Sequence, residues 1–215
     1  MDYSPKTATT HYKIISIIVF ICAALFASLF VFHQNNKPKK VLTSSDGVSL
    51  FSVARDLKPF ELQDHHKNIF SEKQLRDHWT LIFFGFTHCS DVCPITLDML
   101  KHSYNDLKKI TPNIQIVFVS LDPERDSTQT ISQYMQQYNP EFIGTTAKLS
   151  DLRKLQSQFG IYSERDQIKS NHDYQIKHSS SIILVNNQGK WAGLFKFGMN
   201  SKQFIEAYQE SIKSL

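Results

Sequence analysis

The residues of this chain best suited to chemistry lie together in the segment Phe84–Pro94, whose sequence is FGFTHCSDVCP. Two of the three cysteines in the chain, Cys89 and Cys93, stand four positions apart in this segment. Residues at this spacing share one face of a helix, so the two sulfur atoms can point the same way. The pair could therefore close a disulfide or hold a single metal ion.

The position of the pair along the chain also favours reactive sulfur. The segment follows an apolar run and precedes a helical pattern, so it covers the start of a helix, where the helix dipole favours a thiolate over a thiol. Pro94 suits a first helical turn, because its missing N–H would have no partner there. The alternative is that both cysteines are small core residues. The polar neighbours His88, Ser90 and Asp91 argue against that alternative.

The supply of further ligands limits the choice of metal. A structural zinc site normally takes four protein ligands, and the sequence has no second cysteine pair to complete one. His172 and His178 have suitable internal spacing, but they lie too far along the chain from the cysteines for a zinc finger. Two thiolates suit copper(I), and an added imidazole lets copper(II) bind as well. The sequence therefore favours copper over zinc.

His178 is the best candidate for that imidazole. It stands just before an expected strand, Ser181–Asn186, at the end of the sheet where loops converge beside the first helix. His88 is adjacent to Cys89, and adjacent residues tend to point apart. A turn-capping or surface role for His178 is the alternative. The other histidines, which have no comparable placement, are His65, His66, His78, His102 and His172.

Alternating apolar patterns predict the elements that position these residues. The runs Thr80–Phe86 and Ile114–Leu121 are apolar, β-branched and aromatic, as expected of strands buried on both faces. Between them, apolar positions spaced three and four apart predict a helix that includes Cys93. The other expected elements are helices over Thr128–Tyr138, Ser150–Phe159 and from Ser201 onward, and strands Ser181–Asn186 and Trp191–Phe197 joined by a turn at Asn187–Gly189. A parallel pair first and an antiparallel pair last predict a thioredoxin-like α/β sandwich.

An uncharged apolar run, Ile14–Phe32, precedes the domain and predicts a single transmembrane helix. A cleaved signal peptide is the alternative, but its apolar region would be shorter, about 7–15 residues. We therefore expect a tail over 1–13, an anchor over 14–32, a tether with room for one short strand over 33–58, and the domain over 59–215. Lysines flank the run on both sides, so charge leaves the topology open. The tail lacks arginine, which fits a bacterial inner-membrane protein better than a mitochondrial import.

The composition and charge of the chain limit the kinds of molecule that it can bind. With 41% hydrophobic residues, the 215-residue chain is long enough for one cored domain. The net charge of +4 comes from lysines on either side of the apolar run, and residues 41–215 carry equal numbers of acidic and basic side chains. Nucleic-acid binding depends on clustered basic side chains. We therefore expect no nucleic-acid partner.

Several further segments, taken with FGFTHCSDVCP, resemble the Sco/SenC family of copper chaperones for cytochrome c oxidase. They are Val117–Asp126 (VFVSLDPERD), Phe142–Gly144 (FIG), Phe159–Tyr162 (FGIY) and His178–Ile182 (HSSSI). The match runs from about Pro59 to the C-terminus and keeps the order and spacing of these segments. Ser90 stands where proline is common between the cysteines, and Lys67 replaces a usual glycine in an early hairpin. Neither departure touches a ligand position.

The resemblance implies a membrane-anchored thioredoxin-like domain in the periplasm, on the outer side of the inner membrane. It also implies one copper ion bound by Cys89, Cys93 and His178, with Asp122 as a supporting acidic residue. Taken by itself, Asp122 could instead cap the turn before Pro123.

Two functions follow from these residues and this resemblance. The first is a metallochaperone that passes copper by ligand exchange to the dinuclear copper site of cytochrome c oxidase subunit II. The second is a thiol-disulfide oxidoreductase that reduces the cysteines of that subunit, with Cys89 and Cys93 as attacking and resolving thiols in either order. A copper-donating chaperone or a thioredoxin-like reductant is the expected upstream partner. A peroxiredoxin is disfavoured, because Thr87 stands at the wrong offset from the cysteines.

Overall fold

The computed structural model describes residues 15, 18–28, 47–166 and 174–215, and it divides into two compact units, Met1–Lys40 and Val41–Leu215. In the first unit the described residues of the expected anchor are helical and exposed. Within the described part of the chain, no helix combines the length and apolarity that a bilayer crossing requires. The rest of the run Ile14–Phe32 and residues 33–46 lie outside the described residues.

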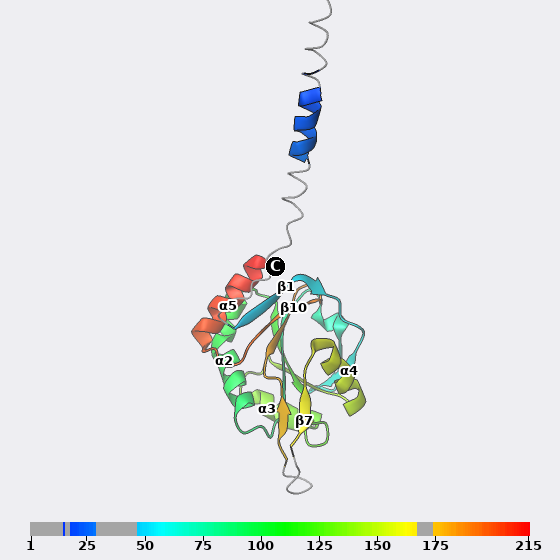
Figure 1. Ribbon diagram of the computed structural model, residues 1–215. Helices are drawn as coiled ribbons and strands as arrows, with labels where there is room; N and C mark the ends of the chain where they lie inside the picture. The colour runs from blue at the N-terminus through cyan, green and yellow to red at the C-terminus, as the bar shows by residue number, and fades with distance from the viewer. Residues whose placement is uncertain (1–14, 16–17, 29–46, 167–173) are drawn as a thin grey trace, which may run out of the picture. The chain divides into compact units, whose positions relative to one another are not determined.

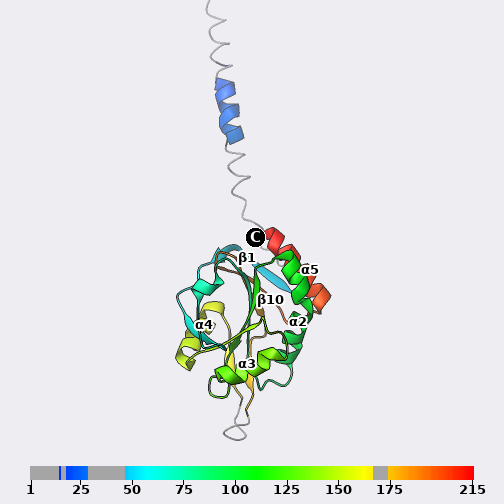
Figure 2. The same cartoon turned by 180° about the vertical axis from the view of Figure 1, so that it is seen from behind.

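The second unit contains a mixed β-sheet with helices on both faces (Figures 1 and 2). The strands are β1 Val48–Arg55, β2 Glu61–Asp64, β3 Ile69–Ser71, β4 Trp79–Gly85, β5 Ile114–Ser120, β6 Ile143–Thr146, β7 Ser163–Arg165, β8 Ile176–His178, β9 Ile182–Val185 and β10 Trp191–Phe195. The helices are η1 Glu72–Leu75, a 3-10 helix, then α2 Val92–Ile110, α3 Thr128–Gln136, α4 Leu149–Phe159 and α5 Ser201–Ser214.

The strands of the main sheet lie in the order β1-β10-β9-β4-β5-β6-β2-β3. β5 pairs in parallel with β4 and with β6, whereas β9 and β10 form an antiparallel pair. β7 and β8 form a separate two-stranded antiparallel sheet. The parallel pair and the antiparallel pair expected from the sequence are thus confirmed, and each expected strand and helix lies within two residues of its predicted bounds.

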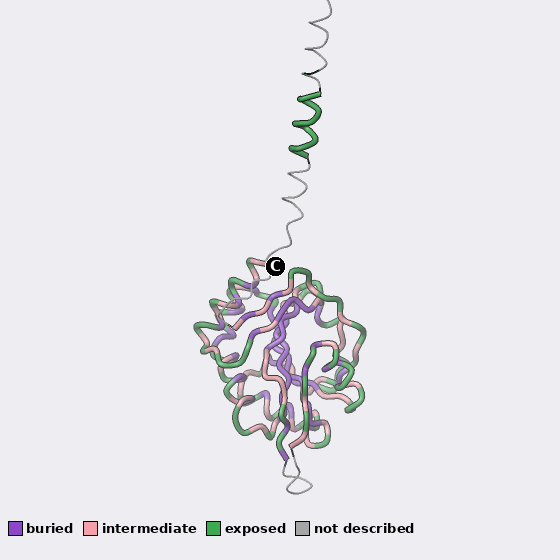
Figure 3. Tube along the Cα trace, in the orientation of Figure 1, coloured by how far each residue is buried: buried purple, intermediate pink, exposed green. Residues whose placement is uncertain are grey.

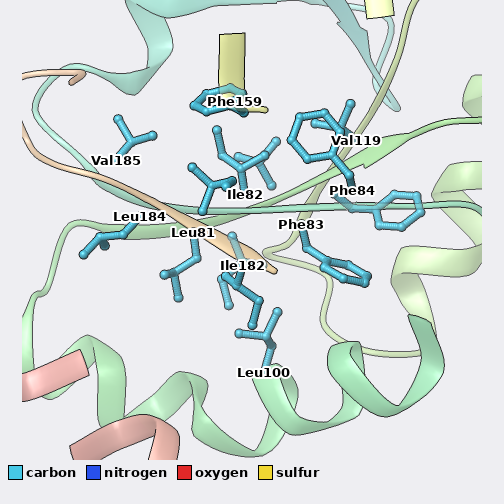
Figure 4. Packing of buried hydrophobic residues seen from close by; sticks show 14 of the residues in the cluster. Leu81, Ile82, Phe83, Phe84, Leu100, Val119, Phe159, Ile182, Leu184 and Val185 are labelled. Atoms are coloured by element: carbon cyan, nitrogen blue, oxygen red, sulfur yellow. The ribbon is translucent and has the colours of Figure 1, made fainter. Parts of the chain in front are cut away.

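The central strands β4 and β5 are buried along almost their whole length, as their continuous apolar sequence predicts (Figure 3). Successive side chains of a strand point to opposite faces of the sheet. In Figure 4, Leu81 and Phe83 point toward Leu100 of α2, whereas Ile82 points toward Phe159 of α4. The α2 and α5 helices pack together on one face, and α4 covers the other (Figures 1 and 2). This packing fixes the end of β4, where the cysteine segment begins.

The expected start of the domain at residue 59 needs correction. β1 is an edge strand of the main sheet, with Val48 opposite Phe195 of β10, and it lies inside the segment expected to be a tether. Only Val48 and Leu50 of this strand are buried. Its apolar alternation is therefore too short to distinguish a strand from a linker in the sequence.

A hairpin joins β2 and β3 at the position where the family resemblance expects a glycine. Lys67 adopts a positive φ of 69° there, a backbone region that favours glycine. Its N–H donates to the carbonyl of Asp64 at 2.9 Å and closes the turn. The replacement of glycine by lysine thus leaves the turn conformation in place.

Candidate metal centre

The two cysteines lie between the end of β4 at Gly85 and the first turn of α2. The N–H of Cys89 donates to the carbonyl of Phe86 at 3.2 Å, which turns the chain toward the helix. The N–H of Cys93 then donates to Sγ of Cys89 at 3.4 Å. The N-cap residue of α2, Asp91, makes no side-chain cap bond, so the sulfur of Cys89 takes the place of a capping oxygen. The first turn of α2 therefore uses the sulfur of Cys89 as a hydrogen-bond acceptor.

His178 reaches the cysteines from the last residue of β8. Its Nε2 lies 3.7 Å from Sγ of Cys93, and its Nδ1 lies 2.9 Å from the carbonyl oxygen of Ser179. A carbonyl oxygen only accepts hydrogen bonds, so this contact assigns the ring proton to Nδ1. The Nε2 lone pair is therefore directed to the sulfurs, which is the usual arrangement of a metal-binding imidazole.

The structure brings Cys89, Cys93 and His178 into one group, whose ligand atoms all lie within 4.8 Å of one another. Within the described residues no other histidine joins them. His65 lies against Gly144, and His102 lies against Asp98 of its own helix. His172 lies outside the described residues.

Apolar groups enclose the inner side of this site. Cys93 is fully buried, whereas Cys89 and His178 are half-buried. The rings of Phe83 and Phe86 lie 6.3 and 6.0 Å from the ring of His178. A Cβ at Gly85 would lie 2.9 Å from Sγ of Cys93, so only glycine leaves room for this sulfur without displacement. The group is closed on the side of the core and accessible through its two half-buried members.

The two thiols share one negative charge. A hydrogen bond from the Cys93 thiol, together with backbone N–H groups of Asp91 and Cys93, outweighs the effect of burial and lowers the pKa of Cys89 to about 4. The same bond, burial and the charge on Cys89 raise the pKa of Cys93. At neutral pH the pair therefore carries a thiolate at Cys89 and a thiol at Cys93. The second proton is expected to leave only when a cation arrives.

Alkylation rates will test this distribution of charge. Because Cys89 is ionised down to about pH 4, its reaction with iodoacetamide should proceed at nearly the same rate at pH 6 and pH 8. An ordinary thiol with a pKa near 8.5 slows roughly 100-fold over that interval. Peptide mass spectrometry of the reduced, metal-free protein will report the rate at each cysteine. In Cys93→Ala, which removes the donating S–H group, the Cys89 rate should become steeply pH-dependent. Equal rates for Cys89 and Cys93 at pH 6 would contradict the assignment.

Asp122 does not contact the metal-ligating group. Its carboxylate is fully buried and accepts hydrogen bonds from the Tyr174 hydroxyl and from Nε of Arg125, each at 2.5 Å. Its backbone carbonyl accepts the N–H groups of Arg125 and Asp126, which forms the turn after β5. The side chain thus binds other side chains and does not cap the turn before Pro123.

Asp126 is a positioning residue that the sequence analysis did not single out. Its buried carboxylate accepts the Thr87 N–H at 2.9 Å, the Thr87 hydroxyl at 2.6 Å and the Ser120 hydroxyl at 2.6 Å. It therefore ties the chain just before Cys89 to the end of β5. A single aspartate in a polar loop carries no sequence signal for such a role, because its partner Thr87 is 39 residues away.

Comparison with known proteins places this site in a family. The sequence model of SCO1/SenC matches residues 52–213. This chain belongs to the SCO1/SenC family. A SCO2-like protein of Rickettsia prowazekii is 30% identical over 204 residues, which cover 91% of this chain and 96% of that protein.

Two solved structures share the fold. Arabidopsis thaliana ScoI with copper bound has a TM-score of 0.69 and 26% identity, covering 74% of this chain and 98% of that one. Yeast Sco1 with copper bound has a TM-score of 0.67 and 28% identity, covering 74% of this chain and 88% of that one. The resemblance to the family and the thioredoxin-like α/β fold class are confirmed.

Proposed function

We propose that this protein is a copper metallochaperone that delivers copper to the dinuclear copper site of cytochrome c oxidase subunit II. The observation that carries the proposal is the convergence of two thiols and an imidazole whose Nε2 faces them. Soft sulfur ligands select copper(I), and the imidazole adds a ligand that suits copper(II). Membership of the SCO1/SenC family and the copper-bound structures of two relatives support this choice of metal.

The three side chains divide the tasks of holding and releasing the ion. The thiolate of Cys89 supplies the charge that attracts a cation, and the buried thiol of Cys93 gives up its proton on binding. The His178 ring is already oriented by the Ser179 carbonyl, so little ordering is needed. Because Cys89 and His178 are half-buried, an incoming sulfur ligand from a donor or an acceptor protein can approach from their side.

Copper stoichiometry is the direct test of this function. The reduced protein should bind one copper(I) ion, and one copper(II) ion in a sulfur-ligated form with the strong visible absorption of thiolate-to-copper charge transfer. Elemental analysis after gel filtration will give the ratio. A protein that retains no copper of either oxidation state, or that gains the same amount with both thiols alkylated, would exclude the proposal.

A thiol-disulfide oxidoreductase is the second candidate, and the unequal pKa values of the two thiols favour it. The Cys89 thiolate would attack a disulfide of the oxidase subunit and release one substrate thiol. Cys93 would then displace the second substrate thiol and leave a Cys89–Cys93 disulfide. A thioredoxin-like reductant must supply two electrons to restore the dithiol. This cycle uses no imidazole ligand.

We also propose that the chain is a single-pass protein of the bacterial inner membrane with its domain in the periplasm. The apolar run Ile14–Phe32 and the family resemblance support this location. A reporter enzyme that needs disulfides to fold, fused after Leu215, should be active, whereas a cytoplasm-only reporter at the same position should be inactive. The reverse pattern would contradict this topology.

A further inference from the structure

The histidine ligand is carried by a hairpin that stands apart from the main sheet. Among the described strands, β8, which ends at His178, pairs with β7 alone, and these two strands form their own sheet. The cysteines, by contrast, follow directly from the central strand β4. The distance between the imidazole and the sulfurs therefore depends on the side chains that hold this hairpin to the domain.

Tyr174 makes the most buried of these contacts. It stands two residues before β8, is only 3% exposed, and donates its hydroxyl to Oδ1 of Asp122 at 2.5 Å. Asp122 is fully buried in the loop after β5. Burial, together with this bond to Asp122, raises the pKa of Tyr174 to about 12, so the hydroxyl keeps its proton and remains a donor.

Two arginines pack on the same tyrosine. The guanidinium carbon of Arg125 lies 3.6 Å from the Tyr174 ring centroid, and that of Arg165 lies 4.5 Å from it. Arg125 also donates to Asp122, and Arg165, the last residue of β7, forms an ion pair with Glu124 at 2.7 Å. A guanidinium group over the face of an aromatic ring is attracted to it, and the attraction strengthens as the group is withdrawn from water. Both strands of the hairpin are thus attached to the β5–α3 loop.

The same loop holds the cysteine segment through its second buried carboxylate. Asp126 binds the N–H and hydroxyl of Thr87, and Asp122 binds Tyr174. The two aspartates are four residues apart and are joined by a backbone bond from Asp126 N–H to Asp122 O at 2.8 Å. One short loop therefore fixes the two parts of the chain that must meet at the metal.

We propose that Tyr174, seated on Asp122 and Arg125, is a positioning residue that sets the place of His178 relative to the two thiols. This inference rests on the proposed copper-binding function, since it concerns the third ligand of that site. Tyr174 itself touches no ligand atom in any contact the structure shows. Loss of its hydroxyl removes one of the hydrogen bonds that compensate a buried carboxylate, which loosens the hairpin without altering either thiol.

The test compares Tyr174→Phe with Tyr162→Phe in the full-length protein. Tyr162 is a matched control, because it lies beside the same hairpin but is 58% exposed and bonds to the exposed Glu164. In Tyr174→Phe the copper(II) affinity should fall about 10- to 100-fold, as for other partners outside the ligand set. The copper(I) affinity should stay unchanged, because both thiolates remain. The nitrogen hyperfine signal of copper(II) should weaken in electron paramagnetic resonance, and Tyr162→Phe should match the wild type in each measurement.

Hydrogen exchange of the metal-free protein provides an independent measurement. Peptides covering β7 and β8 should exchange faster in Tyr174→Phe than in the wild type, and those of β4 and β5 should not change. Unchanged hairpin exchange with unchanged copper(II) affinity, or equal losses of copper(I) and copper(II), would overturn the inference. Should Tyr174→Phe fail to fold, Arg165→Gln replaces it. We expect the same lower copper(II) affinity and the same faster exchange of β7 and β8 in that variant. A wild type that binds no copper would refute the proposed function, while the exchange data would still decide the role of Tyr174.

Discussion

Replacement of Cys89 or Cys93 with alanine is expected to abolish tight copper binding, whereas His178→Ala should lose copper(II) selectively. Either cysteine variant leaves one sulfur and one imidazole, which is too few soft ligands for copper(I). The loss should exceed the roughly 100-fold that removal of a partner outside the ligand set costs. His178→Ala keeps both thiolates, so copper(I) binding should survive. Competition with chelators specific for each oxidation state will measure the copper(I) and copper(II) affinities of each variant.

Cys22→Ala and His102→Ala are the matched controls for these variants. Cys22 is the remaining free cysteine among the described residues and belongs to the separate N-terminal unit. His102 is exposed on α2, where its Nδ1 lies 2.8 Å from the carbonyl of Asp98 in the preceding turn. Both should bind copper as the wild type does. Full copper(II) binding by His178→Ala, at one ion per protein, would remove the histidine from the ligand set.

The parts of this site that sequence predicted are those determined by local spacing. Cys89 and Cys93 are four residues apart at a strand-to-helix junction, so their proximity follows from helix geometry alone. β4 and β5 were predictable because continuous apolar runs of this length suit strands buried on both faces. His178 is 85 residues from Cys93, and its candidacy depended on where the loops of the expected fold converge.

Elements with weak local patterns were not predictable. β7 and β8 have three residues each, too few for a periodicity to register, yet they carry the histidine. β1 alternates apolar and polar residues over only its first three positions, Val48 to Leu50. The roles of Asp122 and Asp126 depend on partners 52 and 39 residues away, Tyr174 and Thr87. A buried carboxylate is recognised only when the tertiary structure shows which donors surround it.

Copper and oxidation compete for the same two sulfur atoms. The described cysteines are free thiols, and a disulfide between Cys89 and Cys93 would leave no thiolate to bind metal. Copper(I) bound to the pair should correspondingly slow disulfide formation, since the thiolates are withdrawn from exchange. This protection is expected whether the protein delivers copper or reduces a partner. Only a variant that separates the imidazole from the thiols can distinguish the two functions.

In cells, His178→Ala should lower cytochrome c oxidase activity strongly if copper delivery is the function. The variant keeps both thiols, so a reductase cycle between Cys89 and Cys93 would continue, whereas the copper(II) form of the site would lose its imidazole ligand. Added copper should restore part of the activity to His178→Ala. It should restore none to the double variant Cys89→Ala/Cys93→Ala, which has lost both thiolates.

Oxidase turnover in membranes, normalised to the amount of each variant on an immunoblot, is the measurement that decides between the two functions. His102→Ala serves as the control for loss of an unrelated histidine and should retain full activity. If His178→Ala also supports full activity without added copper, the imidazole is dispensable and delivery that depends on the copper(II) form of the site is excluded. Cys89 and Cys93 would then be the site residues that oxidase activity needs, as expected for thiol-disulfide exchange. If His178→Ala lowers oxidase activity and added copper restores it, the activity requires copper bound by all three residues. Loss of the imidazole leaves both thiols of a reductase cycle in place, so that cycle would not explain the lower activity.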